Sequence, residues 1–153
     1  MASFISQYFV ADQGRAALDL TGTSVKVCLV DGTFALTATD QYLGDGTLGE
    51  VSATGYTGGH GNAGRRTITG ITATLGASGI TVYWDGADPT TWSSVASGAT
   101  INGAVLHVQG ASDDTTAKII AFYDLTDTPT NGSDITLSWN ASGFLKYTRA
   151  TGS

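Results

Sequence analysis

The stretch TGGHGNAGRRTITGITATLG, residues 57–76, decides between two fold classes. Its first half places three glycines, within residues 59–64, in the G-x-G-x-x-G spacing of a dinucleotide-binding loop. Such a loop binds phosphate because a helix begins directly after it. Here β-branched residues follow instead and are interrupted by Gly70, a pattern that favours a strand with a bulge or bend. The stretch therefore predicts a glycine-rich loop leading into a strand at 66–67, and nucleotide binding is not expected.

Strand-like segments recur along the rest of the chain about every dozen residues, separated by Gly, Asn and Asp. The predicted strands are 24–30, 65–76, 79–88, 99–110, 117–125, 133–140 and 141–149. The last segment is expected to close a hairpin. No alternation of strands with helices, which would build a parallel sheet, is present. We therefore expect a mainly β fold, an antiparallel β-sandwich or barrel.

The N-terminal segment is the only one with helical spacing. Within 4–20, aromatic and aliphatic residues recur at intervals of three and four, although Gly14 weakens the middle. We expect residues 1–20 to form a short helix or an extended arm, followed by a single β domain over 21–153. A shorter helical turn is expected within 37–46. We also expect the domain to fold without residues 1–10.

The composition argues against several classes of partner. The 153 residues carry a formal net charge of −6, and only 13% of them are charged. An acidic chain is poorly suited to binding nucleic acid through its phosphates. No apolar run approaches the length of a membrane-spanning helix, and no signal peptide is evident. We expect neither nucleic acid nor membrane as a partner.

The residues that could carry chemistry are few and scattered. Cys28 alternates within a strand and is expected to be a small buried hydrophobe. His60 lies in the glycine-rich loop and is expected to be solvated, whereas His107 is expected to be a packing residue with its polar atoms satisfied. No zinc motif or nucleophile motif is present, and the aspartates at 113–134 are typical of solvated turns. We expect no enzyme activity, no metal and no cofactor.

Adjacent aromatic residues indicate that both faces of the sheet are covered. Neighbouring side chains of a strand point to opposite faces, so the pairs at 83–84 and 122–123 place at least one ring each on a second face. That face is covered either by a second sheet or by a partner.

Several stretches, in their order, resemble a family of tailed-bacteriophage structural proteins, the head decoration (cement) or minor structural proteins. The stretches are ASFISQYFV (2–10), DLTGTSVKVCLV (19–30), DQYL (40–43), GEVSATGYTGG (49–59), R-x-I-T-G (66–70), DPTTWSSV (88–95), GAVLHVQG (103–110), IIAFYDL (119–125) and DITLSWNASGFLKY (134–147). Together they cover most of the chain, and none is a catalytic motif.

The resemblance implies an architectural role on the outside of a phage head. The expected partner is the major capsid protein, the expected assembly a homo-oligomer (trimer or dimer), and the expected location the capsid surface after synthesis in the host cytoplasm. We expect the N-terminal segment to supply an apolar anchor, or else to cap the protein's own core. The glycine-rich loop offers a second contact. The candidate partner-binding residues are Phe4, Ile5, Tyr8, Phe9, Arg65 and Arg66.

Three alternative functions stay open. The first is a phage tail, tail-tip or fibre-associated structural protein. The second is a carbohydrate-binding β-sandwich, for which Trp84, Trp92 or Trp139 exposed in a groove would be the sign. The third is a hydrolase on a β scaffold, which would require Asp and His side chains to converge.

Overall fold

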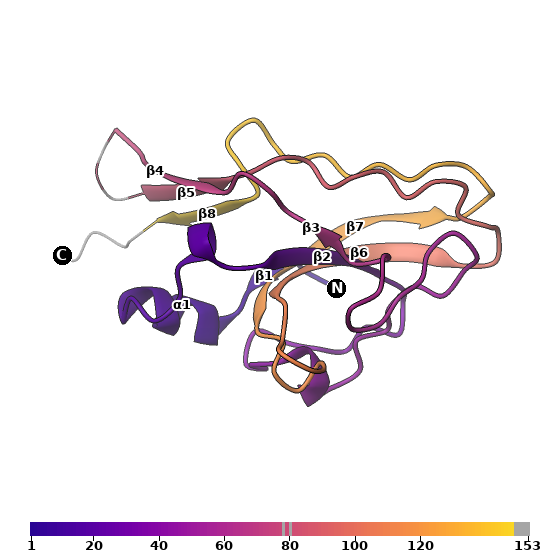
Figure 1. Ribbon diagram of the computed structural model, residues 1–153, viewed down its shortest axis with the longest axis horizontal. Coiled ribbons are helices and arrows are strands. Elements are labelled where there is room, and N and C mark those ends of the chain that lie inside the picture. The colour runs from indigo at the N-terminus through magenta and orange to yellow at the C-terminus, as the bar shows by residue number, and fades with distance from the viewer. Residues whose placement is uncertain (78, 80, 149–153) are drawn as a thin grey trace.

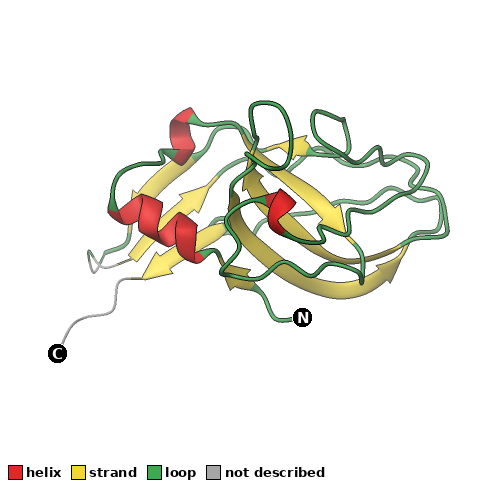
Figure 2. Cartoon of the chain, turned by 90° about the horizontal axis from the view of Figure 1, so that it is seen from below, coloured by secondary structure: helices red, strands yellow, loops and turns green. Residues whose placement is uncertain are grey.

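The computed structural model describes residues 1–77, 79 and 81–148, and it is mainly β. Two antiparallel sheets, one of five strands and one of three, form a sandwich-like fold that does not close into a barrel. The predicted fold class is confirmed, with the sandwich in place of the barrel. Figures 1 and 2 show the three-stranded sheet and the helix at one end of the molecule and the long strands of the larger sheet extending toward the other.

The elements follow one another along the chain with long loops between several of them. They are β1 (Phe4–Ile5), α1 (Gln7–Gly14), η1 (Leu20–Gly22), β2 (Val25–Val30), η2 (Leu43–Asp45), β3 (Arg66–Thr67), β4 (Thr72–Leu75), β5 (Thr81–Asp85), β6 (Thr100–Val108), β7 (Ile119–Pro129) and β8 (Leu145–Thr148).

The larger sheet has the order β1-β7-β6-β2-β3, and the smaller has the order β4-β5-β8. The long central strands β2, β6 and β7 hold the larger sheet together, with Val27 opposite Leu106 and Leu106 opposite Ala121. The two outer strands β1 and β3 have two residues each. The larger sheet therefore ends in short edges, which natural β proteins use to limit unwanted pairing.

Both faces of the larger sheet are buried, as the aromatic pair at 122–123 predicted, whereas the pair at 83–84 lies on β5 of the smaller sheet. One face packs with the smaller sheet and the segments that link the two sheets, around Trp92 and Leu106. The other face is covered by Phe34, Leu36 and Leu43, which lie in the long connection between β2 and β3. The cover of the second face is therefore a set of loops of the same chain, visible below the sheet in Figure 1, and neither a second sheet nor a partner.

The N-terminal segment is part of the sandwich and not a separate arm. Strand β1 pairs with β7, so that Phe4 lies opposite Phe122. Ser6 begins the helix, because its side chain accepts a hydrogen bond from the Phe9 N–H. The helix ends at Gly14, earlier than the periodicity over 4–20 suggested. A helical turn is present within 37–46, as expected, in the form of η2.

Gly70 divides the predicted strand 65–76 into two strands of different sheets. Its φ of +64° places it in the left-handed region, which glycine adopts without strain. The chain leaves the larger sheet after β3 and enters the smaller one at β4. The predicted bend is present, and its consequence is a change of sheet.

The predicted strand 133–140 is wrong. The segment forms two isolated bridges, between Ile135 and Trp92 and between Asn140 and Gly143, and its Trp139 N–H donates to the Asp88 carboxylate. Its alternating residues do lie partly buried on one side. The alternating residues reflect an extended segment that packs one side against the core. Such packing does not require a hydrogen-bonded neighbouring strand.

The final segment also pairs differently from the prediction. Strand β8 joins β5 of the smaller sheet and makes no hairpin with 133–140. Of the residues in the predicted strands, Ile80 and Arg149 lie outside the described part of the chain, as does the end of the predicted domain at 149–153.

Candidate functional site

The N-terminal residues expected to form an apolar anchor are mostly turned inward. Phe9 is buried and meets the Trp84 ring edge-on, with the ring centres 6.0 Å apart. Phe4 is half-buried; its ring stacks on Phe34 and packs at a tilt against Phe122, both on the loop-covered face. For these two residues the structure supports the other expectation, in which the segment caps the protein's own core.

Tyr8 differs, because 46% of its surface is exposed. It lies on α1 beside Gln7, Ala11 and Thr39, which with it line a shallow hollow that carries no charged side chain. Tyrosine on a rigid helix offers apolar area and a hydroxyl at low entropic cost, and such residues are frequent in the energetic centres of interfaces.

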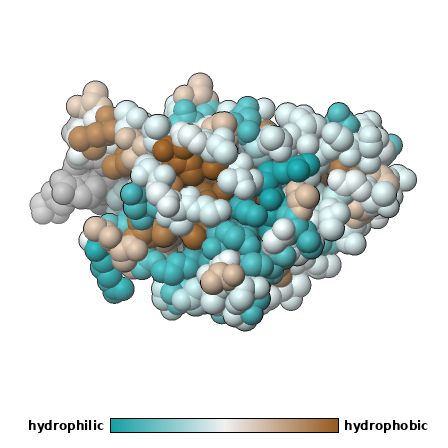
Figure 3. Space-filling view, viewed as in Figure 1, coloured by the Kyte–Doolittle hydropathy of each residue, from teal (hydrophilic) through white to brown (hydrophobic). Residues whose placement is uncertain are grey.

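A groove lies next to this helix, between the edge strands of the two sheets. Its walls are Phe4 and Ile5 from β1 and the segment 144–146 at the start of β8. The hydroxyl of Tyr123, which lies on β7 and also lines the groove, donates to the Phe144 carbonyl and so ties one wall to the larger sheet. The half-exposed parts of Phe4 and Ile5 therefore line a recess and do not project outward. Figure 3 shows hydrophobic residues gathered toward the end of the molecule that holds α1, β4, β5 and β8, while the opposite end is mostly of intermediate hydropathy.

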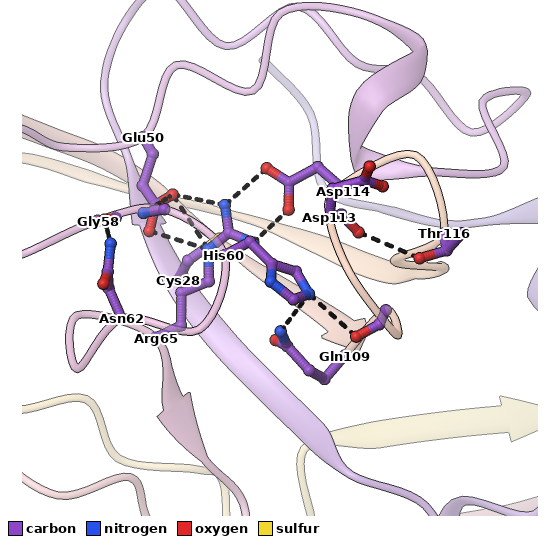
Figure 4. Close-up of polar contacts among 12 residues, drawn as sticks. Cys28, Glu50, Gly58, His60, Asn62, Arg65, Gln109, Asp113, Asp114 and Thr116 are labelled. Carbon is purple, nitrogen blue, oxygen red and sulfur yellow. Dashed lines mark hydrogen bonds and ion pairs between the residues drawn. The ribbon is translucent and has the colours of Figure 1, made fainter.

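The second predicted contact, Arg65, is buried. Its side chain has no exposed surface and is bound by two carboxylates (Figure 4). Nε and NH2 donate to Glu50, with NH2–Oε2 at 2.7 Å, and NH1 and NH2 donate to Asp114, with NH1–Oδ1 at 2.5 Å. The planar guanidinium suits this two-sided arrangement, because its N–H groups diverge in one plane.

The arrangement around Arg65 alters the protonation of its members. The hydrogen bond from Arg65 holds the pKa of Asp114 below its ordinary value. Burial acts to lower the pKa of Arg65, but the hydrogen bonds to Asp114 and Glu50 outweigh it and the pKa is raised. The cation is therefore permanently charged and neutralised within the chain. The expectation that Arg65 contacts a partner is therefore corrected.

Glu50 links this ion pair to the β core. It accepts a hydrogen bond from the Tyr56 hydroxyl at 3.0 Å, and that hydroxyl accepts one from the Leu29 N–H of β2. The backbone N–H of Gly59 also donates to Glu50. The glycine-rich loop is thereby held by a carboxylate from an earlier part of the same connection between β2 and β3.

The glycines of the loop allow close backbone packing. A Cβ on Gly64 would collide with the Thr57 carbonyl, which accepts a hydrogen bond from the Gly64 N–H. The Gly64 carbonyl in turn accepts a hydrogen bond from the buried Trp92 indole at 2.6 Å. The loop then enters β3 at Arg66, as predicted. Contacts within the chain order it, and no phosphate-binding helix follows.

Arg66 is half-buried and faces a different part of the protein from Arg65. Its guanidinium lies over the Trp92 ring, 5.7 Å from the ring centre, and donates to the Thr91 carbonyl. Its Nε is buried and has no hydrogen-bond partner in the structure. Arg66 thus covers the edge of the core and retains some exposed surface.

The two histidines occupy unequal environments. His60 is half-buried, with Nε2 2.9 Å from the Gly110 carbonyl oxygen and 2.6 Å from Gln109 Nε2, so the expectation of a solvated side chain is wrong. His107 is fully buried on β6, but neither ring nitrogen has a hydrogen-bond partner, so the expected satisfied state is not found. Burial, with a further contribution from the charge of Arg65, lowers the pKa of His107 to about 3.

The remaining candidates for chemistry are enclosed. Cys28 is buried, as predicted, and burial raises the pKa of its thiol. Among the described residues, no group of three or more His, Cys, Asp and Glu side chains is placed to hold a metal ion. In the same part of the chain, no helix is long and apolar enough to cross a membrane.

The tryptophans do not form a sugar-binding groove. Trp92 and Trp84 are buried. Trp139 is half-buried, packs against Tyr123 and Phe144, and donates its indole N–H to the Ala87 carbonyl. The sign on which the carbohydrate-binding alternative depended is therefore missing.

Comparisons with protein families, with curated proteins and with solved structures found no match to this chain.

Proposed function

We propose that this protein is a virion structural protein, a capsid decoration protein that binds the outside of a phage head and stabilises the coat-protein lattice. The order of motifs in the sequence supports this proposal. Tyr8 is the structural observation that carries it, as an exposed aromatic residue on a helix that Phe9 anchors in the core.

The environment of Tyr8 suits a protein partner. The hollow around it is formed by uncharged side chains, so that its burial against a coat subunit would leave no charge buried without a partner. The helix is positioned by Phe9 in the core and by the Ser6 N–H, which donates to the Ile120 carbonyl. A preorganised aromatic side chain loses little conformational freedom on binding. Many copies on one shell would then convert a modest individual affinity into stable attachment.

The direct test is co-sedimentation with empty, expanded shells of the coat protein from the same phage. Wild-type protein is expected to sediment with the shells. Tyr8→Asp is expected to weaken binding at least about tenfold, because a loss of about 1.4 kcal/mol at one central contact has that effect.

The matched control is Thr128→Asp, which introduces the same charge at an exposed position on the distal part of β7. It should bind like wild type. Absence of wild-type binding to shells, with co-sedimentation with purified tails instead, would replace the proposal by the tail alternative. Equal weakening by both variants would show that Tyr8 is not the contact.

A further inference from the structure

The outer edge of β4 is the most open strand edge in the described part of the chain. The strand is the first in the order β4-β5-β8 and pairs only with β5. All of its residues, Thr72–Leu75, are exposed, and Leu75 is 64% exposed. The strand contains no charge, proline or bulge, the devices by which proteins protect an edge.

The other edges differ from this one. Strands β1 and β3 have two residues each, β8 carries Lys146, and the part of β7 beyond β1 carries Asp124, Asp127 and Pro129. Among the described strands, only β4 therefore has an uncharged edge of four exposed residues that includes an exposed leucine. We propose that this edge pairs with the β4 edge of a second copy of the same chain, forming a continuous six-stranded sheet across a two-fold axis. The proposal rests on the geometry of the edge and not on the proposed function.

The hydrogen-bond pattern shows which residues of β4 face outward. The Gly76 N–H donates to the Thr81 carbonyl, so this pair belongs to the hydrogen-bonded class of the antiparallel ladder. Pairs alternate along such a ladder. Thr74 and Thr72 therefore direct their backbone groups toward β5, and Ala73 and Leu75 direct theirs toward the free edge.

Symmetry then selects the register. In an antiparallel pair directly opposite residues share a face, so a two-fold axis normal to the sheet must place one residue directly opposite its own copy. An axis at Thr74 places Ala73 of each copy opposite Leu75 of the other. Ala73 and Leu75 are the residues whose backbone groups face outward. In this register the N–H and C=O of each bond to the C=O and N–H of the other residue in the second copy.

The side chains of the strand are complementary to themselves in the same register. Thr74 meets its own copy, and threonine pairs are favourable across strands. Leu75 gains Ala73 of the second copy on the face that carries Val82 and Trp84, so the apolar face of the sheet continues across the axis. No like charges come opposite each other, although each chain carries a net charge of −6. A partner strand with charged side chains would find no opposite charge on this neutral edge and would not continue its apolar face.

The interface is small, so the dimer is expected to be weak in free solution and to become populated at high protein concentration. Cross-linking detects such a dimer best. Thr74→Cys places two thiols across a non-hydrogen-bonded pair, where Cα atoms lie about 4.5 Å apart, within the range that a disulfide spans. The matched control Thr72→Cys lies on the same face and strand, but its two copies would be roughly 13 Å apart. The native Cys28 is buried and does not interfere.

On mild oxidation of the full-length chain, Thr74→Cys is expected to form a disulfide dimer on the order of tenfold faster than Thr72→Cys, because pairing raises the local thiol concentration. Equal rates for the two variants would overturn the proposal.

Sedimentation of proteins without added cysteines provides a second measurement. Ala73→Pro removes an outward N–H and keeps the bonds to β5. Its far-ultraviolet circular dichroism should match wild type, while its dimer fraction falls. An unchanged dimer fraction, or a wild-type protein that remains monomeric at every concentration, would contradict the proposal. Neither measurement involves coat shells, so failure here is separate from failure of the proposed function.

Discussion

Arg65 and Asp114 lie 49 residues apart in the sequence and form a two-point ion pair, with NH1–Oδ1 at 2.5 Å and NH2–Oδ2 at 2.9 Å. The pair joins the glycine-rich loop to the connection between β6 and β7. Glu50 binds the other side of the same guanidinium. Arg65 was a candidate partner contact from the sequence. In the structure it cross-links three segments of the chain.

Replacement of Arg65 by lysine should destabilise the protein. A lysine ammonium cannot donate in a planar fork to both carboxylates, and one buried acceptor would be left unpaired, at a cost of about 2 kcal/mol. Urea unfolding of Arg65→Lys measures this loss. Arg66→Lys is the control and should cost less than about 1 kcal/mol, since that side chain is half-exposed. Similar losses for both variants would mean that the network contributes little.

His107 should make the stability depend on pH between about 6.5 and 3. The pKa of the unfolded imidazole is near 6.5, and burial lowers the folded value to about 3. Between these values only the unfolded chain binds the proton, so the free energy of unfolding falls as the pH drops, by at most about 1.4 kcal/mol per pH unit. Above this window the histidine is neutral in both states and has no effect.

Chemical denaturation at pH 7, 5 and 4 tests this dependence in wild type and in His107→Leu. The variant should lose less stability on acidification than wild type. Asp114, whose pKa is lowered by its bond from Arg65, adds a further loss only below its ordinary value of 3.8. Superimposable pH profiles for the two proteins would exclude His107 as the cause.

Truncation of the two neighbouring aromatic residues of α1 should change the stability of the protein by very different amounts. Phe9→Ala empties a buried site against Trp84 and should cost about 3–4 kcal/mol. Tyr8→Ala changes an exposed side chain and should stay within about 1 kcal/mol. Thermal unfolding distinguishes the two. For the same reason, deletion of residues 1–10, which removes β1 and Phe9, should destabilise the domain, contrary to the expectation from sequence.

Cys28 should be unreactive in the native protein. Its side chain is buried on β2 and burial raises the pKa of the thiol, so both access and thiolate formation are suppressed. Maleimide labelling followed by mass spectrometry should show modification in urea and almost none in buffer. Rapid labelling of the native protein would show that β2 opens locally.

Local patterns in the sequence determined the fold class and most of the strands. The strands predicted at 24–30 and 99–110 are present as β2 and β6, because their apolar, β-branched runs favour a buried strand through neighbouring residues alone. The alternation at 133–140 was misleading, since it reports burial on one side and contains no information on a hydrogen-bonded partner. The sequence predicted a bend at Gly70, but it did not predict that the strands before and after the bend belong to different sheets.

Only the tertiary structure decided what the candidate side chains do. The aromatic spacing at 4–9 is the same whether Phe9 enters the core and Tyr8 stays outside or the reverse. Likewise, nothing near Arg65 in the sequence indicates Asp114, because that contact depends on how the loops after β2 and β6 close over one face of the sheet. Local periodicity specifies which residues are strands, whereas the pairing of distant charges and the open edge of β4 follow from strand order, which the sequence encodes only through the whole chain.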